Sequence, residues 1–214
     1  MSRSAALVPD PATPVDAATD TPTEPARRAA RKDAQRNREA LLVAAAGAFA
    51  ERGADCSLEE IARRAGVGIG TLYRHFPNRD ALIEAVYRRE VATLCDRVPE
   101  LLAELEPLDA LRAWLREFAG YIARKRGMAV ALKAALGPDN QLFTESHRRM
   151  HEAFDAVLSA AVQSGAVRPD ANPDDLMRGL SGICMASDTT TQCAERNARL
   201  VDLLVDGLRF GAPN

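Results

Sequence analysis

The sequence predicts an all-α protein of about nine helices, arranged as a small N-terminal part and a larger C-terminal part. Aromatic residues make up only 5% of the 214 residues, which is sparse for a β-sandwich or barrel. Alanine, leucine and arginine, which all favour helices, are abundant. Apolar residues recur at helical spacing, and no stretch keeps the alternating pattern of a strand.

The first two predicted helices have clear end signals. The first begins near Asp33 and ends at Gly53, whose backbone can take the left-handed conformation that closes a helix. The second starts with a capping box, in which the Ser57 hydroxyl accepts the backbone amide of Glu60 and the Glu60 carboxylate reaches back to the amide of Ser57. Gly66 ends this helix and begins a turn.

Proline, glycine and asparagine separate the remaining predicted helices. Asn78 can cap the fourth helix, and Pro107 fits the first turn of the fifth. The expected helices after Gly66 cover, in order, residues 69–75, 79–98, 107–126, 128–136, 140–164, 173–190 and 194–210.

Charge is distributed unevenly, although the formal net charge is only −2. Residues 27–89 carry more arginine and lysine than acidic residues, whereas residues 1–26 and 90–214 are acidic. A basic module indicates a polyanion as partner. Residues 1–26 are rich in alanine, proline and threonine and poor in large apolar residues, so we expect a disordered tail there.

A cluster of cations follows this tail and has two interpretations. It is either the solvated start of the first helix or an arm that neutralises phosphate groups and reaches a minor groove. The cluster consists of Arg27, Arg28, Arg31, Lys32, Arg36 and Arg38.

Several classes of protein are disfavoured by motifs that the sequence lacks. No apolar run approaches the roughly 20 residues that cross a bilayer, and the start does not resemble a secretory signal. The four cysteines form no Cys-x-x-Cys pair. No nucleophile elbow, phosphate loop or metal-ligand set is present, so we expect no enzyme, no cofactor and no metal. We expect a cytoplasmic protein with reduced cysteines and no membrane partner.

The segment around the third predicted helix has the features of a helix-turn-helix. Small residues at Ala62 and Ala65 let two short helices cross closely, and Gly66 supplies the turn between them. Leu72 and Phe76 lie one turn apart, so they can hold the second helix to a core while its other side chains face outward.

This segment resembles the DNA-binding domain of the TetR family of bacterial repressors. The residues that carry the resemblance are Ala62 to Leu82, ARRAGVGIGTLYRHFPNRDAL, within a match that covers about residues 33–85. The resemblance implies a homodimer that binds double-stranded operator DNA. Residues 27–85 would be the DNA-binding domain, and residues 86–214 would bind a small organic effector and form the dimer.

The resemblance also implies which residues contact DNA. Thr71 would bond a phosphate or a base edge, Tyr73 would bond a phosphate, and Arg79 stands where the family usually has lysine. The expected DNA-contacting residues are Ser57, Gly68, Ile69, Gly70, Thr71, Tyr73, Arg74, His75 and Arg79.

The start of the predicted recognition helix is poor in side chains that read bases. Gly68 and Gly70 have none, and Ile69 can only contact a thymine methyl group. We therefore expect close backbone approach, phosphate contacts and DNA shape to carry much of the specificity. The alternative is that the two glycines only start the helix loosely and take no part in DNA recognition.

Apolar stripes in the C-terminal half indicate a dimer interface and an effector cavity, although each stripe could also be core. The expected dimer residues are Leu176, Leu180, Ile183, Leu200, Leu203, Leu204 and Leu208. The expected effector-binding residues are Trp114, Phe118, Tyr121, Met128, Phe143, His147, Met150, Phe154, Met177 and Cys184. His147 and His151 could present two imidazoles to a metal, but the sequence offers no third ligand, and solvent exposure is the alternative.

These observations predict a transcriptional repressor that an uncharged or weakly polar effector releases from its operator. An activator or a ligand-independent regulator of the same fold is the alternative, and the sequence does not separate them. A nonspecific architectural DNA-binding protein is disfavoured, because such a protein would be basic over more of its surface.

Overall fold

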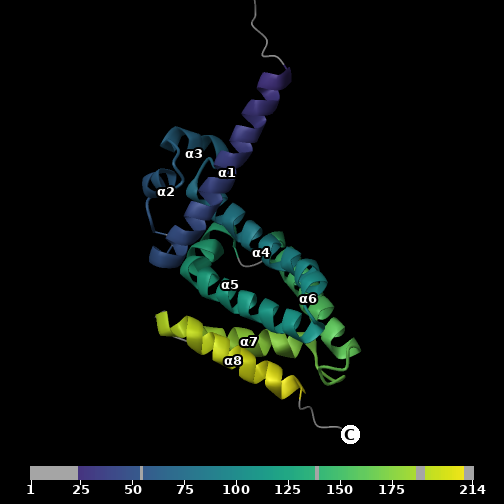
Figure 1. The fold of residues 1–214 in the computed structure, drawn as a ribbon. Coiled ribbons are helices and arrows are strands. Elements are labelled where there is room, and N and C mark those ends of the chain that lie inside the picture. Colours follow the sequence, from purple (N-terminus) through teal and green to yellow (C-terminus); the bar gives the residue numbers. More distant parts are fainter. Residues whose placement is uncertain (1–23, 54, 138–139, 187–190, 210–214) are drawn as a thin grey trace, which may run out of the picture. The chain divides into compact units, whose positions relative to one another are not determined.

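The computed structural model describes residues 24–53, 55–137, 140–186 and 191–209, and these residues form eight helices and no strand (Figure 1). The predicted all-α class is confirmed. The chain divides into two compact units, one ending at Gln35 and the other beginning at Arg36. The helices are α1 (Glu24–Arg52), α2 (Leu58–Arg64), α3 (Ile69–His75), α4 (Arg79–Glu104), α5 (Pro107–Leu136), α6 (Gln141–Gln163), α7 (Pro173–Ala186) and α8 (Thr191–Arg209).

Helices α1, α4 and α8 run further than the sequence pattern predicted, and α8 begins at Thr191 rather than near Ala194. Helix α1 begins at Glu24 rather than near Asp33, because alanine, arginine, lysine and glutamine continue the helix without an interior breaker. The expected disorder is therefore wrong for residues 24–26, and residues 1–23 lie outside the described residues. Helix α4 continues past Pro99 to Glu104, since Leu101 beyond the proline is buried.

The two helices expected at residues 107–126 and 128–136 form the single helix α5. Met128 and Leu132 are buried beyond Gly127, so their packing outweighs the modest helix penalty of one glycine. The helix expected at residues 173–190 is described only to Ala186, because residues 187–190 lie outside the described part of the chain.

Most predicted helix ends are confirmed. Gly53 has a φ of +72°, and its amide donates to the carbonyl of Phe49 at 2.9 Å. The Ser57 hydroxyl accepts a hydrogen bond from the Glu60 amide at 3.1 Å, and the Asn78 side chain accepts one from the Ala81 amide at 2.8 Å. The second half of the predicted capping box is wrong, because the Glu60 carboxylate bonds to arginines instead.

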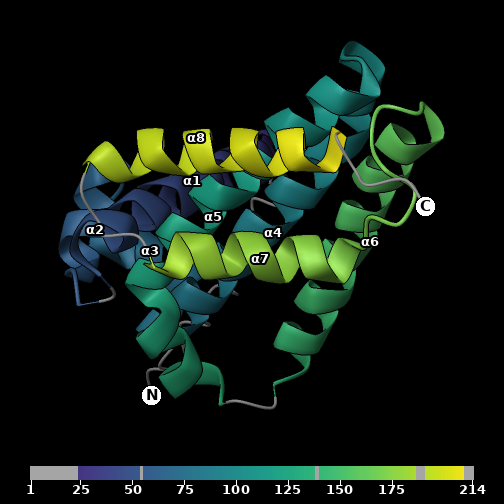
Figure 2. The same ribbon diagram turned by 90° about the horizontal axis from the view of Figure 1, so that it is seen from below.

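The C-terminal half is organised around α5, which packs against α4, α6, α7 and α8. Its buried face carries Trp114 and Phe118, which meet Phe154 of α6 edge to face, at ring-centroid distances of 4.6 and 4.8 Å. The Trp114 indole nitrogen donates to the carbonyl of Leu94 at 2.8 Å, which joins α5 to α4. Helices α7 and α8 lie side by side and antiparallel (Figure 2).

No helix in the described residues is long and apolar enough to cross a membrane.

Candidate functional site

Helices α2 and α3 are joined by the tight turn that a helix-turn-helix requires. Gly66 has a φ of +70°, which a residue with a side chain would adopt only under strain. The amide of Val67 donates to the carbonyl of Ala62 at 3.0 Å, and Ala62 is buried where α2 packs on α3. The glycine and the alanine therefore have the structural roles that the sequence predicted.

Helix α3 has one buried face and one exposed polar face. Leu72 and Phe76 are buried in the core, and the Phe76 amide closes the helix by donating to the Leu72 carbonyl at 2.8 Å. Tyr73 is 47% exposed and Arg74 is also exposed. Because Leu72 and Phe76 hold one side of α3 against the core, the hydrogen-bonding side chains of Tyr73 and Arg74 face solvent.

The first turn of α3 contains glycines that the fold itself does not require. Gly68 is the N-cap with a φ of −72°, and neither Gly68 nor Gly70 has a positive φ. A Cβ atom added at either position would have no atom within 4 Å outside its immediate neighbours. Ile69 is half-buried against the core, so only part of its side chain is accessible to a thymine methyl group. Two explanations therefore remain for glycine at these positions. Either a DNA backbone approaches closely there, or the glycines only start the helix loosely.

Gly70→Ala separates these explanations, because only close approach of the DNA backbone predicts a loss of DNA affinity. A gain in stability is expected under either explanation. Alanine should raise the free energy of unfolding by up to about 1 kcal/mol through its better helix propensity. If the DNA backbone approaches Gly70, the same substitution should lower DNA affinity by about tenfold. Gly47→Ala in α1, which also has open space around it, is the matched control for stability without a change in α3. Unchanged DNA affinity of Gly70→Ala would favour loose initiation.

Glu60 is the centre of an ion-pair cluster that joins α2 to the end of α1. Its carboxylate accepts from Arg64 at 2.8 Å and from Arg63 at 2.6 Å, and Arg52 lies 3.4 Å away. Arg64 also pairs with Glu51 at 2.9 Å. Hydrogen bonds from Arg64 and Arg63 lower the pKa of Glu60 to about 2, so the cluster stabilises the domain above the ordinary carboxyl pKa and weakens as pH falls toward 2.

Arg79 has a structural contact that the sequence did not reveal. It is half-buried, and its Nη1 donates to the backbone carbonyl of Cys56 at 2.7 Å, which fixes the start of α4 against the segment before α2. Arg38 likewise lies over the ring of Phe76, 5.2 Å from its centroid. His75 is half-buried with its ring 6.3 Å from that of Phe76, and Thr71 is also half-buried.

Comparisons with known proteins agree with this geometry. The bacterial tetR regulatory protein family matches residues 41–86, and the C-terminal domain of SbtR-like transcriptional regulators matches residues 106–210. The structure of the TetR transcriptional regulator SCO0520 from Streptomyces coelicolor is 47% identical in sequence and has a TM-score of 0.76, with 82% of this chain and 99% of that chain covered. The chain belongs to the TetR family.

Two further TetR-family proteins are similar over most of their length. A TetR regulatory protein from Mycobacterium vanbaalenii is 32% identical with a TM-score of 0.69, covering 84% of this chain and 99% of that one. The transcriptional repressor KstR2 of Mycolicibacterium smegmatis is 27% identical over 75% of this chain and 78% of its own. As a TetR-family member, the chain is a DNA-binding transcriptional regulator and not an enzyme.

Most residues expected to bind an effector form the core of the TetR-family C-terminal domain. His147 is the exception, because the structure places it on the exposed side of α6. Phe143 is half-buried, with its ring centroid 5.7 Å from that of Tyr87. The remaining residues are buried: Trp114, Phe118, Tyr121, Met128, Met150, Phe154, Met177 and Cys184.

Tyr121 differs from its neighbours in this core. Its hydroxyl group is buried and makes no hydrogen bond of good geometry among the described residues, although it interacts with the neighbouring Tyr87 hydroxyl. Burial raises the pKa of Tyr121 well above the usual tyrosine range, so the hydroxyl stays protonated. The Lys125 ammonium lies 5.8 Å from the Tyr121 ring and 5.2 Å from the Tyr87 ring. A buried hydroxyl without a well-formed hydrogen bond is unfavourable and can be satisfied by a bound polar atom.

The two histidines of α6 face different surroundings. His151 Nε2 lies 3.3 Å from the carboxylate of Asp174 in α7, whereas His147 is exposed. Among the described residues, no three histidine, cysteine, aspartate or glutamate side chains form a group that could hold a metal ion.

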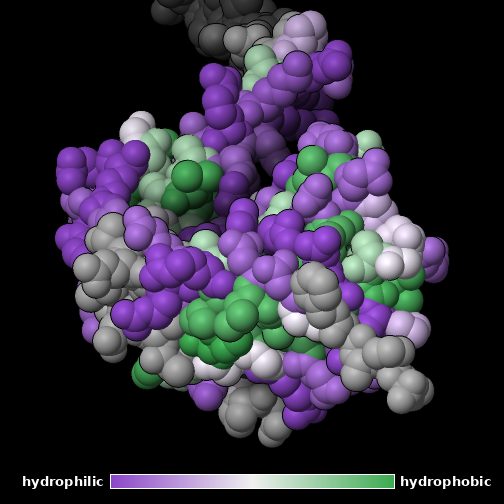
Figure 3. Space-filling view, turned by 60° about the horizontal axis from the view of Figure 1, so that its bottom comes forward, coloured by the Kyte–Doolittle hydropathy of each residue, from purple (hydrophilic) through white to green (hydrophobic). Residues whose placement is uncertain are grey.

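The expected dimer residues divide into buried and exposed groups. Leu176 and Leu180 are buried within the subunit, so they belong to its core rather than to a free surface. Leu203 is 70% exposed, and Met185, which was not among the expected dimer residues, is 64% exposed. Figure 3 shows an apolar patch surrounded by hydrophilic surface on the side where α7 and α8 lie. The half-buried members are Ile183, Leu200, Leu204 and Leu208.

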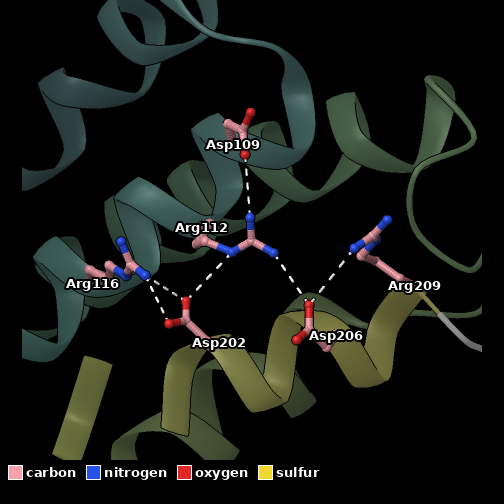
Figure 4. A network of polar contacts seen from close by, with 6 residues as sticks. All are labelled: Asp109, Arg112, Arg116, Asp202, Asp206 and Arg209. Atoms are coloured by element: carbon pink, nitrogen blue, oxygen red, sulfur yellow. Dashed lines mark hydrogen bonds and ion pairs between the residues drawn. The ribbon is translucent and has the colours of Figure 1, made fainter. Parts of the chain in front are cut away.

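An ion network connects α5 to α8 (Figure 4). Arg112 reaches Asp109 and Asp206 at 3.3 Å and Asp202 at 3.5 Å, and Arg116 bonds Asp202 at 2.7 Å. All three carboxylates are more than one-third exposed, so each pair alone contributes little to stability. Together the pairs hold α8 in a defined position against α5.

Cys95 should react slowly with alkylating reagents. Burial raises the pKa of its thiol from 9.0 to about 11, so its thiolate fraction at pH 8 is roughly a hundredth of that of an exposed thiol. The Cys95 thiol keeps its proton to a higher pH in the folded state than in the unfolded state, so the free energy of unfolding should fall as pH rises from about 9 toward 11. Mass spectrometry after timed iodoacetamide treatment at pH 8, with and without denaturant, measures the difference; equal rates would contradict it.

Proposed function

We propose that this TetR-family regulator is a sequence-specific repressor, which binds its operator as a homodimer and is released by a small organic effector. The observation that carries the proposal is the exposed face of α3, where Tyr73 and Arg74 are held outward by the buried Leu72 and Phe76. In this proposal residues 27–85 bind DNA and residues 86–214 bind the effector and form the dimer.

The exposed residues of the helix-turn-helix would divide the work of recognition. Tyr73 bonds a phosphate, and Arg74 bonds a phosphate or a base edge. Thr71 and the exposed part of Ile69 contact base edges. Ser57, His75 and Arg79 fix the domain on the DNA backbone, and the backbone at Gly68 and Gly70 approaches it closely.

Two substitutions test this division of roles on the duplex that the protein selects from a random pool. Tyr73→Phe should weaken binding by roughly threefold to tenfold on every duplex, because it removes one phosphate hydrogen bond. Thr71→Ala should change the preference between duplexes, and Thr93→Ala, on the exposed surface of α4, is the matched control. Wild-type affinity in both α3 variants would refute the proposed interface.

The dimer would form through α7 and α8. Leu203 and Met185 are exposed there, and Gly179, Gly182 and Gly207 leave open space for close approach by a second copy. Apolar exposure of this kind marks an interaction surface. Leu203→Glu should convert the dimer to a monomer in analytical ultracentrifugation, and a monomeric wild-type protein would overturn the proposed interface.

The effector would be an uncharged organic molecule with at least one polar atom. Among the described residues no charged side chain lies wholly in the core, and the partly buried Arg126 already donates to the backbone carbonyl of Cys184, so an uncharged effector would cost less to bury than a charged one. The buried hydroxyl of Tyr121 could donate to a polar atom of the effector. The effector would favour a conformer in which the two recognition helices no longer match successive major grooves, about 34–36 Å apart.

Trp114 provides the readout for this part of the proposal, because it is the only tryptophan and is fully buried beside Phe118 and Phe154. A compound whose binding changes the fluorescence of Trp114 should also release the protein from its operator. Tyr121→Phe should lower the affinity for this compound without lowering the affinity for DNA. Compounds that bind but leave operator affinity unchanged would favour a ligand-independent regulator. A reporter with and without the gene separates repressor from activator.

A further inference from the structure

The first part of α1, residues 24–35, presents four cations on one side of the helix. Arg27 and Arg31 are four residues apart, as are Arg28 and Lys32, so at about 100° per residue the four side chains fall within less than half of the helix circumference. All four are exposed. Ala29 and Ala30 fall on the opposite side of the helix, which has no large apolar residue.

These cations differ from many arginines of the later helices. No ion pair joins Arg27, Arg28, Arg31 or Lys32 to any carboxylate of the described residues. Arginines in α4, α5 and α6 are instead held by carboxylates of the same or a neighbouring helix. Examples are Arg88 with Glu84 at 2.7 Å, Arg124 with Glu90 at 2.6 Å and Arg148 with Glu145 at 2.6 Å.

The position of the four charges is unfavourable for the helix by itself. The N-terminal end of a helix is positive, so cations in its first turns raise the free energy of the helix. Like charges four residues apart, such as Arg27 with Arg31 and Arg28 with Lys32, also repel one another. An external polyanion would remove both unfavourable contributions at once.

We infer that residues 24–35 form a second DNA-binding element, whose exposed cations bind phosphates of the operator DNA in addition to the phosphates bound by the helix-turn-helix. This inference rests on the proposed binding of operator DNA. Twelve helical residues span about 18 Å, the length of roughly five base pairs, so several phosphates lie within reach of one helix face. The absence of large apolar residues on residues 24–35 favours DNA over a membrane surface as the polyanion.

The test measures how the affinity for the selected duplex depends on salt. Arg28→Gln combined with Lys32→Gln removes two phosphate-binding cations while glutamine keeps the helix propensity. The slope of log affinity against log salt should become shallower by about 0.9 for each phosphate that is no longer neutralised, so by about 2 for this pair. Adding Arg27→Gln and Arg31→Gln should extend the change to as much as about 4. The matched control, Lys133→Gln with Arg148→Gln on exposed positions of α5 and α6, removes the same charges and should leave the slope nearly unchanged.

Amide hydrogen exchange provides the second readout. DNA should slow exchange in residues 24–35 of the wild-type protein, and the glutamine variant should lose this protection. A variant with the wild-type slope and unchanged protection would overturn the inference, while leaving the helix-turn-helix interface intact. Failure of the proposed function gives a different result, since wild-type protein would then show no preference for any duplex and Tyr73→Phe would have no effect.

Discussion

Phe154→Ala is expected to lower the free energy of unfolding by about 3–5 kcal/mol. Phe154 is fully buried, and its ring meets those of Trp114 and Phe118 edge to face, at 4.6 and 4.8 Å between centroids. Truncation removes these contacts and leaves a cavity that neighbouring helices can fill only partly. Chemical denaturation followed by the fluorescence of Trp114 measures the change.

The same experiment distinguishes a packed core from an open effector cavity. If Phe154 bordered a cavity, fewer atoms would surround its ring and its truncation would cost less than about 1 kcal/mol. Phe143→Ala is the control, since that ring is half-buried and its removal should destabilise the protein less than that of Phe154. A small cost at Phe154 would therefore contradict the close packing of these aromatic rings.

Leu72→Ala is expected to cost about 2–5 kcal/mol and to abolish measurable DNA binding. Leu72 is the buried residue of α3, a helix of seven residues that is too short to be stable without packing. Without this anchor, Tyr73 and Arg74 are no longer held in a fixed orientation toward DNA. Calorimetry and fluorescence anisotropy with labelled duplex measure the two effects.

Leu105→Ala provides the control for Leu72→Ala, because Leu105 follows α4 and is 40% exposed. It removes the same atoms but should cost little stability and leave DNA affinity unchanged. If Leu72→Ala kept full DNA affinity, α3 would not be the element that presents the contacting residues.

Local signals predicted most of the fold. Gly53, Ser57, Gly66 and Asn78 stop or start helices through their own backbone or side-chain geometry, so their roles could be predicted from neighbouring residues. The errors arose where packing outweighed a local signal. Pro99 did not end α4 because Leu101 beyond it is buried.

The candidate DNA-binding residues could be predicted from the sequence better than the candidate dimer residues. The alternation of buried and exposed residues on α3 depends on helical spacing alone, so Leu72 and Tyr73 were assigned to opposite faces from sequence. Contacts between distant residues could not be predicted, such as Arg79 with the Cys56 carbonyl. In α7, helical spacing placed Leu180 on a stripe but could not show that the stripe faces the core of its own subunit.

Selection of bound duplexes from a random DNA pool, with the affinities of the selected duplexes measured at two salt concentrations, tests the central claim most directly. Our account predicts a palindromic motif bound by two chains, with affinity that depends on both sequence and salt. Binding without any enriched motif, which weakens steeply as salt rises, would show that nonspecific phosphate contacts dominate and would contradict sequence-specific repression.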